Sequence, residues 1–203
     1  MMKRKYKIVV SRAFGMSLMI IASFLVVLLI LAQSHSKQEE NQANHTGIAE
    51  QEKIDFFSKI AVSAQENQEK YGVLSSITMA QAGLESEYGR SQLASKYYNL
   101  FGVKGSQYDG VALPTKEFYN GQWHTVHAYF KVYPSWKESI EQHGRLLHKG
   151  TSWNEAQYKA VIEAKNYKQA ALALVEGGYA TDPQYAEKIV SIIETYQLYK
   201  YDK

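Results

Sequence analysis

The chain has 203 residues, with 23 lysines and arginines, 20 aspartates and glutamates, and no cysteine. This length predicts one globular domain plus additional sequence, and the absence of cysteine excludes disulfide bonds, a thiol nucleophile and zinc–thiolate sites. Five of the basic residues precede residue 13, so the rest of the chain carries 18 basic against 20 acidic residues. This near-neutral remainder argues against nucleic-acid binding as the main function.

Residues 13–32 form an uncharged apolar segment, AFGMSLMIIASFLVVLLILA. As a helix rising about 1.5 Å per residue it would be about 30 Å long, enough to cross the hydrocarbon core of a membrane. The basic segment 1–12 favours a cytoplasmic N-terminus, so the sequence predicts a single-pass transmembrane signal anchor with the following chain on the extracellular face. A cleavable signal peptide is the rival interpretation, but the segment is long for one, and the sequence Leu-Ala-Gln-Ser at its end matches a cleavage site poorly.

Residues 33–52 are polar, contain no aromatic residue and show no apolar periodicity. Such a segment buries too little surface to offset the entropy of the chain, so we expect a disordered tether. Aromatic and aliphatic residues return over 53–203, a length that suits one domain with its own core.

The domain begins with two predicted helices. Apolar residues recur at helical spacing from residue 54, and Gly72 predicts the end of that helix. Ser75 or Ser76 is expected to cap a second helix that ends near Gly89.

A β-hairpin is predicted next, because Asn120-Gly121 is the strongest sequence signal for a two-residue turn, flanked here by 116–119 and 122–126. Three further helices are expected over 135–148, over 167–176 and from Asp182-Pro183 to Tyr196. The predicted fold class is therefore α+β and mainly helical, with one small β-hairpin lobe.

Glu85 is the only ionisable residue of the apolar stretch 77–85. A carboxyl group in such surroundings is desolvated, which raises its pKa toward the range that a general acid needs. The alternative is a glutamate at the end of a helix that simply reaches solvent, and composition favours neither interpretation.

Glu117 acquires a predicted neighbour from the hairpin register. With Asn120-Gly121 at the turn, Glu117 pairs with His124, and cross-strand partners lie on one face about 5 Å apart. His124 could then hold Glu117 ionised or orient it. An ordinary surface pair, worth less than about 1 kcal/mol, is the alternative.

Tyrosine is abundant, with 16 in the chain. Its amphipathic ring stacks on sugar faces while its hydroxyl forms hydrogen bonds, which suits a carbohydrate groove; positions in the core or at its rim are the alternative for most of them. The histidines show no metal-ligand spacing, since His124 and His127 point to opposite faces of one strand. We expect no metal and no other cofactor.

Several short strings occur in a specific order: AQAGLES at 80–86, Gly89, NLFGVKG at 99–105, YPS at 133–135 and GYATDPQY at 178–185. Together they resemble the bacterial β-N-acetylglucosaminidases that cut peptidoglycan, glycoside hydrolase family 73. The resemblance runs from about residue 56 to residue 199.

The resemblance implies a lysozyme-like helical lobe that faces a β-hairpin lobe across a glycan cleft. It also implies hydrolysis of the bond between N-acetylglucosamine and N-acetylmuramic acid in peptidoglycan glycan strands. Glu85 falls on the catalytic general acid of the family, Glu117 on its second carboxylate, and Tyr179 on its active-site tyrosine.

Asn99 and Phe101 fall on the cleft-lining loop of the family. The expected substrate-binding residues are these two and, in addition, Tyr119, His124 and Asp182. The chain departs from the family after the catalytic glutamate, where many members have Gly-Trp-Gly and this chain has Glu-Tyr-Gly at 87–89. The extra carboxylate is expected to point away from the catalytic one, because residues two apart on a helix do not share a face.

The sequence thus predicts a membrane-anchored cell-wall glucosaminidase with its catalytic domain over 53–203. The alternatives are a muramidase, a lytic transglycosylase, or a non-catalytic wall-binding module. The presence of Glu85, Glu117 and Tyr179 weighs against the last of these.

Overall fold

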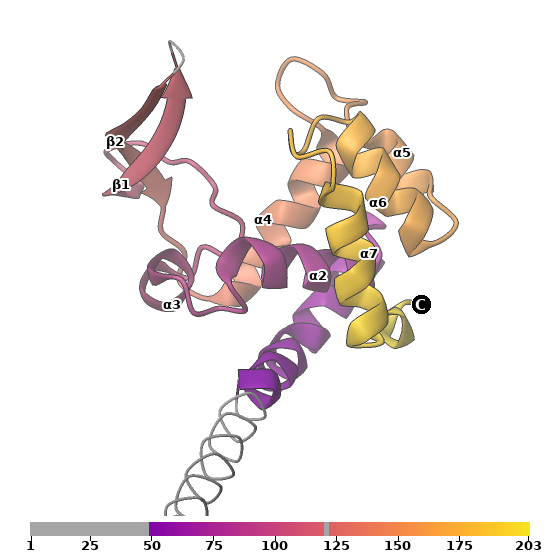
Figure 1. The fold of residues 1–203 in the computed structure, drawn as a ribbon. Coiled ribbons are helices and arrows are strands. Elements are labelled where there is room, and N and C mark those ends of the chain that lie inside the picture. Colours follow the sequence, from indigo (N-terminus) through magenta and orange to yellow (C-terminus); the bar gives the residue numbers. More distant parts are fainter. Residues whose placement is uncertain (1–48, 120–121) are drawn as a thin grey trace, which may run out of the picture. The chain divides into compact units, whose positions relative to one another are not determined.

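The computed structural model describes residues 49–119 and 122–203. The predicted basic segment, the predicted anchor and most of the predicted tether lie outside these ranges. Within them, no helix is both long enough and apolar enough to cross a membrane. Residues 51–203 form one compact unit, and it is mainly helical with a single hairpin, as predicted (Figure 1).

The elements follow in a simple order. A helix over 49–71 comes first. After it come α2 (Ser75–Ser86), α3 (Gln92–Tyr97), β1 (Gly110–Tyr119), β2 (Gln122–Lys131), α4 (Trp136–Lys149), α5 (Lys159–Glu163), α6 (Tyr167–Glu176), α7 (Tyr185–Thr195) and the 3-10 turn η1 (Leu198–Tyr201).

Helix α2 is the central element, in contact with α4, α6, α7 and η1 (Figure 1). Ten of its 12 residues are buried, and the exceptions are Leu84 and Glu85. A helix that is covered nearly all round is part of the core rather than of the surface. The carboxylate of Glu85 is therefore exposed at one of the few places where this helix meets solvent.

The predicted serine cap of α2 is wrong. Ser75 and Ser76 are the first two residues inside the helix, and Leu74 precedes them without a side-chain cap. Their backbone N–H groups are instead satisfied by distant side chains, because Ser75 donates to Gln68 Oε1 (2.9 Å) and Ser76 to Asp202 Oδ1 (2.8 Å). A carboxylate at this end also suits the helix dipole.

Helix α2 ends one turn earlier than the predicted Gly89. Glu87 takes the left-handed conformation (φ 54°) and its N–H donates to the carbonyl of Gly83. Glu87 is thus exposed and lies just beyond the helix. Glu85 lies in the last helical turn, followed at once by a change in chain direction.

The hairpin has the predicted register, with Glu117 opposite His124 and Tyr119 opposite Gln122. Its strands are longer than predicted, with ten residues each. The base of the hairpin is tied to the preceding loop, because Asn99 Nδ2 donates to the carbonyls of both Val103 and Lys131 at 2.9 Å.

Helix α4 begins with the predicted cap. Ser135 Oγ accepts a hydrogen bond from the backbone N–H of Lys137 (3.1 Å) and bonds to the carboxylate of Glu138. Further along, Gly144 allows α4 to approach the first helix closely. A Cβ at Gly144 would lie 2.1 Å from Asn67 Oδ1.

Helix α6 occupies the predicted residues and begins with an Asn166 cap. Helix α7 starts at Tyr185, two residues later than predicted. Asp182 instead closes a turn before the helix, since its side chain accepts from the N–H of Gln184 (2.9 Å) and its carbonyl from the N–H of Tyr185 (3.1 Å). Pro183 therefore lies in that turn and not at the first helical position.

Candidate active site

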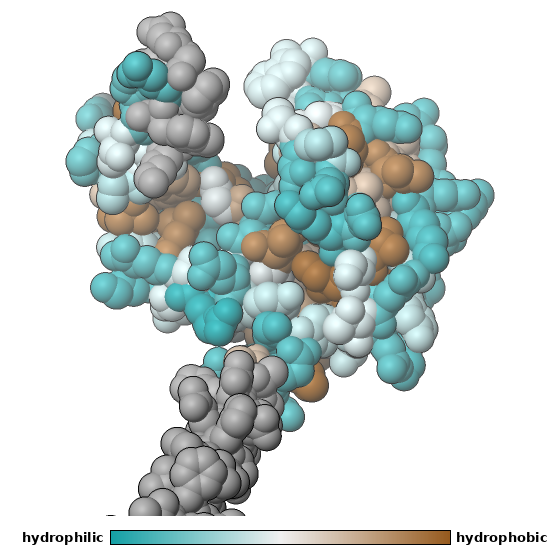
Figure 2. All heavy atoms as spheres, viewed as in Figure 1, coloured by the Kyte–Doolittle hydropathy of each residue, from teal (hydrophilic) through white to brown (hydrophobic). Residues whose placement is uncertain are grey.

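A cavity of about 810 Å³ opens beside the C-terminal end of α2. The surface of residues 51–203 is hollowed between the hairpin and the helical lobe that contains α7, with apolar surface at its base (Figure 2). The cavity is lined by Leu84, Glu85, Phe101, Val103, Lys104, Gln142, His143, Leu146, Tyr158, Gly178, Tyr179, Ala180, Thr181, Asp182, Tyr185 and Lys188. A concave site with an apolar floor and a few polar groups is the usual form of a ligand site.

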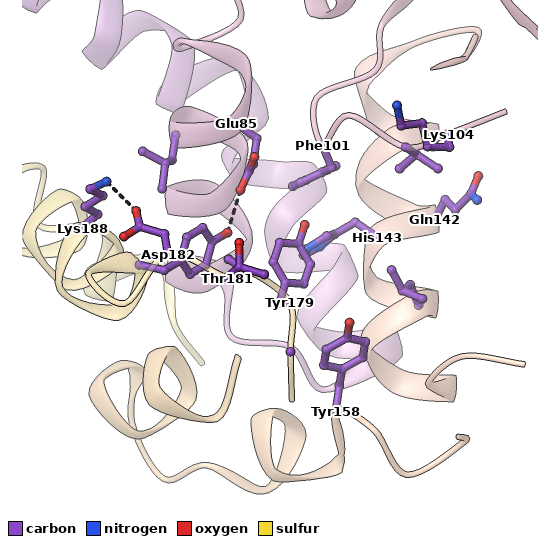
Figure 3. A pocket seen from close by; sticks show the side chains of 16 residues that line it. Glu85, Phe101, Lys104, Gln142, His143, Tyr158, Tyr179, Thr181, Asp182 and Lys188 are labelled. Atoms are coloured by element: carbon purple, nitrogen blue, oxygen red, sulfur yellow. Dashed lines mark hydrogen bonds and ion pairs between the residues drawn. The ribbon is translucent and has the colours of Figure 1, made fainter. Parts of the chain in front are cut away.

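Glu85 is the carboxylate of this cavity. It points from α2 toward the segment 179–182 (Figure 3), and its Oε1 accepts a hydrogen bond from the Tyr185 hydroxyl at 2.8 Å. The side chain is open to the cavity, yet the protein around it displaces enough water to raise its pKa above the usual 4.5, while the Tyr185 hydrogen bond lowers it. A raised pKa keeps more of the carboxyl protonated, as a general acid requires.

Aromatic rings form the wall opposite Glu85 (Figure 3). Phe101 and His143 are stacked, with ring centroids 4.0 Å apart and an interplanar angle of 11°. The ring of Tyr179 packs edge-on against His143, with ring centroids 5.9 Å apart, and against Tyr158, with ring centroids 6.1 Å apart. Burial raises the pKa of Tyr179, so its hydroxyl keeps its proton and can donate a hydrogen bond to a ligand.

His143 is the buried titratable group of this wall. It is 2% exposed, and neither ring nitrogen has a hydrogen-bond partner among the described residues. Burial disfavours the imidazolium and lowers the pKa of His143 from 6.5 to about 3. The ring is therefore neutral in the folded protein at ordinary pH.

This buried imidazole predicts acid sensitivity of the fold. As the pH falls below 6.5, His143 binds a proton in the unfolded chain but stays neutral in the folded protein. The free energy of unfolding therefore decreases by about 1.4 kcal/mol per pH unit. Replacing His143 by phenylalanine keeps the stacked ring and removes this proton. We expect urea unfolding at a series of pH values to show a smaller loss for His143→Phe than for the unchanged protein, and parallel curves would contradict the prediction.

Charged groups stand at two edges of the cavity. Asp182 and Lys188 form an ion pair at 2.5 Å. Lys104 lies over the Phe130 ring, 4.3 Å from its centroid. The Lys188 ammonium donates a hydrogen bond to the Asp182 carboxylate and so lowers the pKa of Asp182. This carboxylate is therefore ionised at neutral pH and is no candidate for a proton donor.

The structure brings several predicted site residues together. Glu85, Phe101, Tyr179 and Asp182 all line the cavity. Asn99 does not: it is 1% exposed, and its amide bonds to the backbone of residues 103 and 131. Asn99 therefore holds the loop that carries Phe101 and the base of the hairpin, which differs from its predicted contact with substrate.

Two of the predicted hairpin residues are placed by their backbone only. Glu117 and Tyr119 lie on β1, and their side chains fall outside the part of the structure that is described. His124, on β2, lies opposite Glu117 in the observed register. The predicted roles of Glu117, Tyr119 and His124 remain predictions.

Sequence reasoning missed three residues of the site. Tyr185, from α7, donates to Glu85, and Gln81, from the preceding turn of α2, donates to Tyr185. His143 comes from α4. Gln81 is four residues before Glu85, a spacing that places both on one helical face and that could have drawn attention to it. Tyr185 and His143 gave no such signal, because their proximity depends on how helices far apart in the sequence pack.

Comparisons with known proteins show which family the chain is similar to. Residues 61–198 match the family model Glucosaminidase, described as mannosyl-glycoprotein endo-beta-N-acetylglucosaminidase. The exo-glucosaminidase LytG of Bacillus subtilis is 45% identical over 205 residues, covering 100% of this chain and 71% of LytG. A probable N-acetylmuramidase of Lactococcus lactis is 40% identical, covering 72% of this chain but 34% of that protein.

A solved structure supports the same grouping. The catalytic domain of the autolysin Auto from Listeria monocytogenes has a TM-score of 0.71 and 39% identity, and the match covers 74% of this chain and 88% of that one. The family match spans well over half of the chain and includes every residue that lines the cavity. The chain therefore belongs to the glucosaminidase family of peptidoglycan hydrolases, glycoside hydrolase family 73, and has its lysozyme-like fold.

Proposed function

We propose that this protein is an endo-β-N-acetylglucosaminidase that hydrolyses the β-1,4 bond between N-acetylglucosamine and N-acetylmuramic acid. The observation that carries the proposal is the Glu85 carboxyl, whose pKa is raised at the base of an aromatic-lined cavity. A carboxyl with a raised pKa beside rings that suit sugar faces is an arrangement that fits a general acid in glycoside hydrolysis.

In the proposed mechanism Glu85 protonates the oxygen that leaves the anomeric carbon. Two groups are candidates for the attack on that carbon. Glu117 can activate a water molecule, which inverts the configuration, or the 2-acetamido group of the substrate can attack first. Tyr179 then positions the acetamido group or the water through its hydroxyl, which stays protonated.

Analysis of the products tests the choice of bond. The full chain is incubated with purified peptidoglycan, and the new reducing ends are reduced and identified by mass spectrometry. We expect reducing-end N-acetylglucosamine. Reducing-end muramic acid would establish the muramidase alternative, which the name of the Lactococcus relative favours, and an anhydro-muramic product would establish a transglycosylase.

The length of the products tests the mode of attack. An endo-acting enzyme releases fragments of many lengths from the start of the digestion, whereas an exo-acting one releases short products from chain ends. The second outcome would align this chain with LytG, which is named as an exo-glucosaminidase. It would overturn the endo assignment while leaving the choice of bond intact.

We also propose that residues 13–32 anchor the protein in the cell membrane with the catalytic domain on the extracellular face. The support is the uncharged apolar length of this segment and the basic residues before it. The full chain should sediment with membranes, and its domain should be cut by protease added outside spheroplasts. Recovery of a shortened protein in the medium would instead favour cleavage after this segment.

A further inference from the structure

A chain of hydrogen bonds links Glu85 to two neighbours that are buried. Gln81 Nε2 donates to the Tyr185 hydroxyl at 3.0 Å, and this hydroxyl donates to Glu85 Oε1 at 2.8 Å. Gln81 is completely buried, and Tyr185 is 4% exposed. Tyr185 also lines the cavity, whereas Gln81 lies behind it and does not. The chain of hydrogen bonds therefore runs from the interior of the protein to the carboxyl of Glu85.

The chemistry of the three groups fixes the direction of the chain. An amide nitrogen only donates, so the Tyr185 oxygen accepts from Gln81, and its single proton is directed to Glu85 Oε1. In a neutral carboxyl the carbonyl oxygen is the better acceptor, so this hydrogen bond favours the proton on the other oxygen. The proton of neutral Glu85 is thereby assigned to Oε2.

We propose that Tyr185, oriented by Gln81, is a positioning residue that holds the transferable proton of Glu85 on Oε2 and stabilises the carboxylate after the transfer. The proposal rests on the proposed role of Glu85 as the general acid. It adds a specific task for two residues that do not themselves react with the substrate.

The proton transfer shows why the bond to Tyr185 matters for rate. The Oε2–H bond of Glu85 breaks, the proton bonds to the glycosidic oxygen, and the electron pair of the C1–O bond stays with that leaving oxygen. Glu85 becomes a carboxylate in the same step. A hydrogen bond to a charged acceptor is stronger than one to a neutral acceptor, so the Tyr185 bond strengthens as the transition state forms and favours kcat.

Burying the amide of Gln81 costs free energy, and its hydrogen bond to Tyr185 gives a reason for an amide at this position. Its Oε1 has no hydrogen-bond partner among the described residues, and a buried unpaired acceptor is unfavourable. An apolar side chain would fill the same position without that cost. The donor that Gln81 offers to Tyr185 is the polar contact that the structure gives this side chain.

Other titratable groups of the cavity stand around Glu85 and enter its pH dependence. Tyr179 precedes α7, His143 belongs to α4, and the Asp182–Lys188 pair and Lys104 occupy the edges. Within the described residues, the influences on the pKa of Glu85 are desolvation, which raises it, and the Tyr185 hydrogen bond, which lowers it. Removal of the Tyr185 hydroxyl should therefore raise this pKa.

Tyr185→Phe tests the proposal by removing the hydroxyl and keeping the ring. We expect kcat on peptidoglycan to fall about ten- to a hundredfold with little change in KM, as for loss of a hydrogen bond to a charged group. The basic limb of the pH profile should move to higher pH. The midpoint of Glu85 itself, followed by carbon NMR of labelled carboxyl groups and assigned with Glu85→Gln, should move in the same direction.

Tyr71→Phe is the matched control. Tyr71 is also buried, and its hydroxyl also donates to a glutamate, Glu141 at 3.2 Å, but outside the cavity. This variant should lose a comparable hydrogen bond without moving the titration of Glu85. Gln81→Met keeps the length of the side chain and removes its donor, so it should move the midpoint and kcat as Tyr185→Phe does, but less.

Each result decides the proposal. The proposal is overturned if Tyr185→Phe leaves both the titration midpoint of Glu85 and kcat unchanged. This holds even if the variant is less stable. If Tyr185→Phe does not fold, Gln81→Met decides by the same two measurements. Full activity in Glu85→Gln would instead refute the proposed function, and the NMR titration, which needs no activity, keeps the two failures apart.

Discussion

Glu85→Gln is expected to lower peptidoglycan hydrolysis by about two to four powers of ten, the usual contribution of a general acid. Glutamine keeps the shape of the side chain and can still accept the Tyr185 hydrogen bond through its amide oxygen. It has no proton of suitable acidity to give to the leaving oxygen. Turnover should therefore be lost while glycan binding and the melting temperature stay close to those of the unchanged protein.

Glu87→Gln is the control for this change. Glu87 is exposed and lies just past the end of α2, so the same loss of charge two residues away should leave the rate within a few-fold of the original. The comparison is made by the decrease in turbidity of a peptidoglycan suspension and by melting curves. Activity of Glu85→Gln within a few-fold of the unchanged protein would refute the assignment of the acid.

Glu117→Gln is expected to slow turnover by a factor in the same range if this carboxylate activates the attacking water. Glu117 lies opposite His124 in the hairpin register. An imidazolium beside a carboxylate lowers the carboxylate pKa, so His124→Ala should raise it. The acidic limb of the pH profile would then move to higher pH, with a smaller loss of rate than in Glu117→Gln.

The combination of outcomes separates the two mechanisms. Nearly full activity in Glu117→Gln would remove its role and favour attack by the substrate acetamido group, with Glu85 and Tyr179. An inactive Glu117→Gln together with an unshifted profile in His124→Ala would keep the catalytic role and refute the electrostatic coupling between the two hairpin residues.

Local sequence signals predicted the elements whose ends are chemically marked. The register of the hairpin followed from Asn-Gly at its turn, the start of α4 from Ser135, and the end of α6 from two glycines. These signals act within a few residues of the feature that they specify, so a single sequence contains them. Helices α3 and α5 were not predicted, because six and five residues are too few to show the helical periodicity of apolar residues.

The errors at α2 and α7 have the opposite origin. Ser75 and Ser76 match a capping residue locally, but Gln68 and Asp202 already satisfy the free N–H groups of that helix. Asp182 is likewise a residue type that commonly caps helices. Here its side chain instead accepts hydrogen bonds from Lys188 and from the backbone N–H of Gln184, which closes a turn. Tertiary contacts decided both cases, and they also brought Tyr185 to Glu85.

The partnership of Ser76 with Asp202 has a consequence for protein synthesis. Ser76 donates to Asp202 through both its backbone N–H and its hydroxyl, across 126 positions of sequence. Because the ribosome works from the N-terminus, Ser76 lacks both bonds until residue 202 has emerged, and Gln68 alone serves this end of the helix that carries Glu85. A translation product that stops short of residue 202 lacks this support for helix α2, so premature termination should yield a chain with a less stable hydrolytic centre.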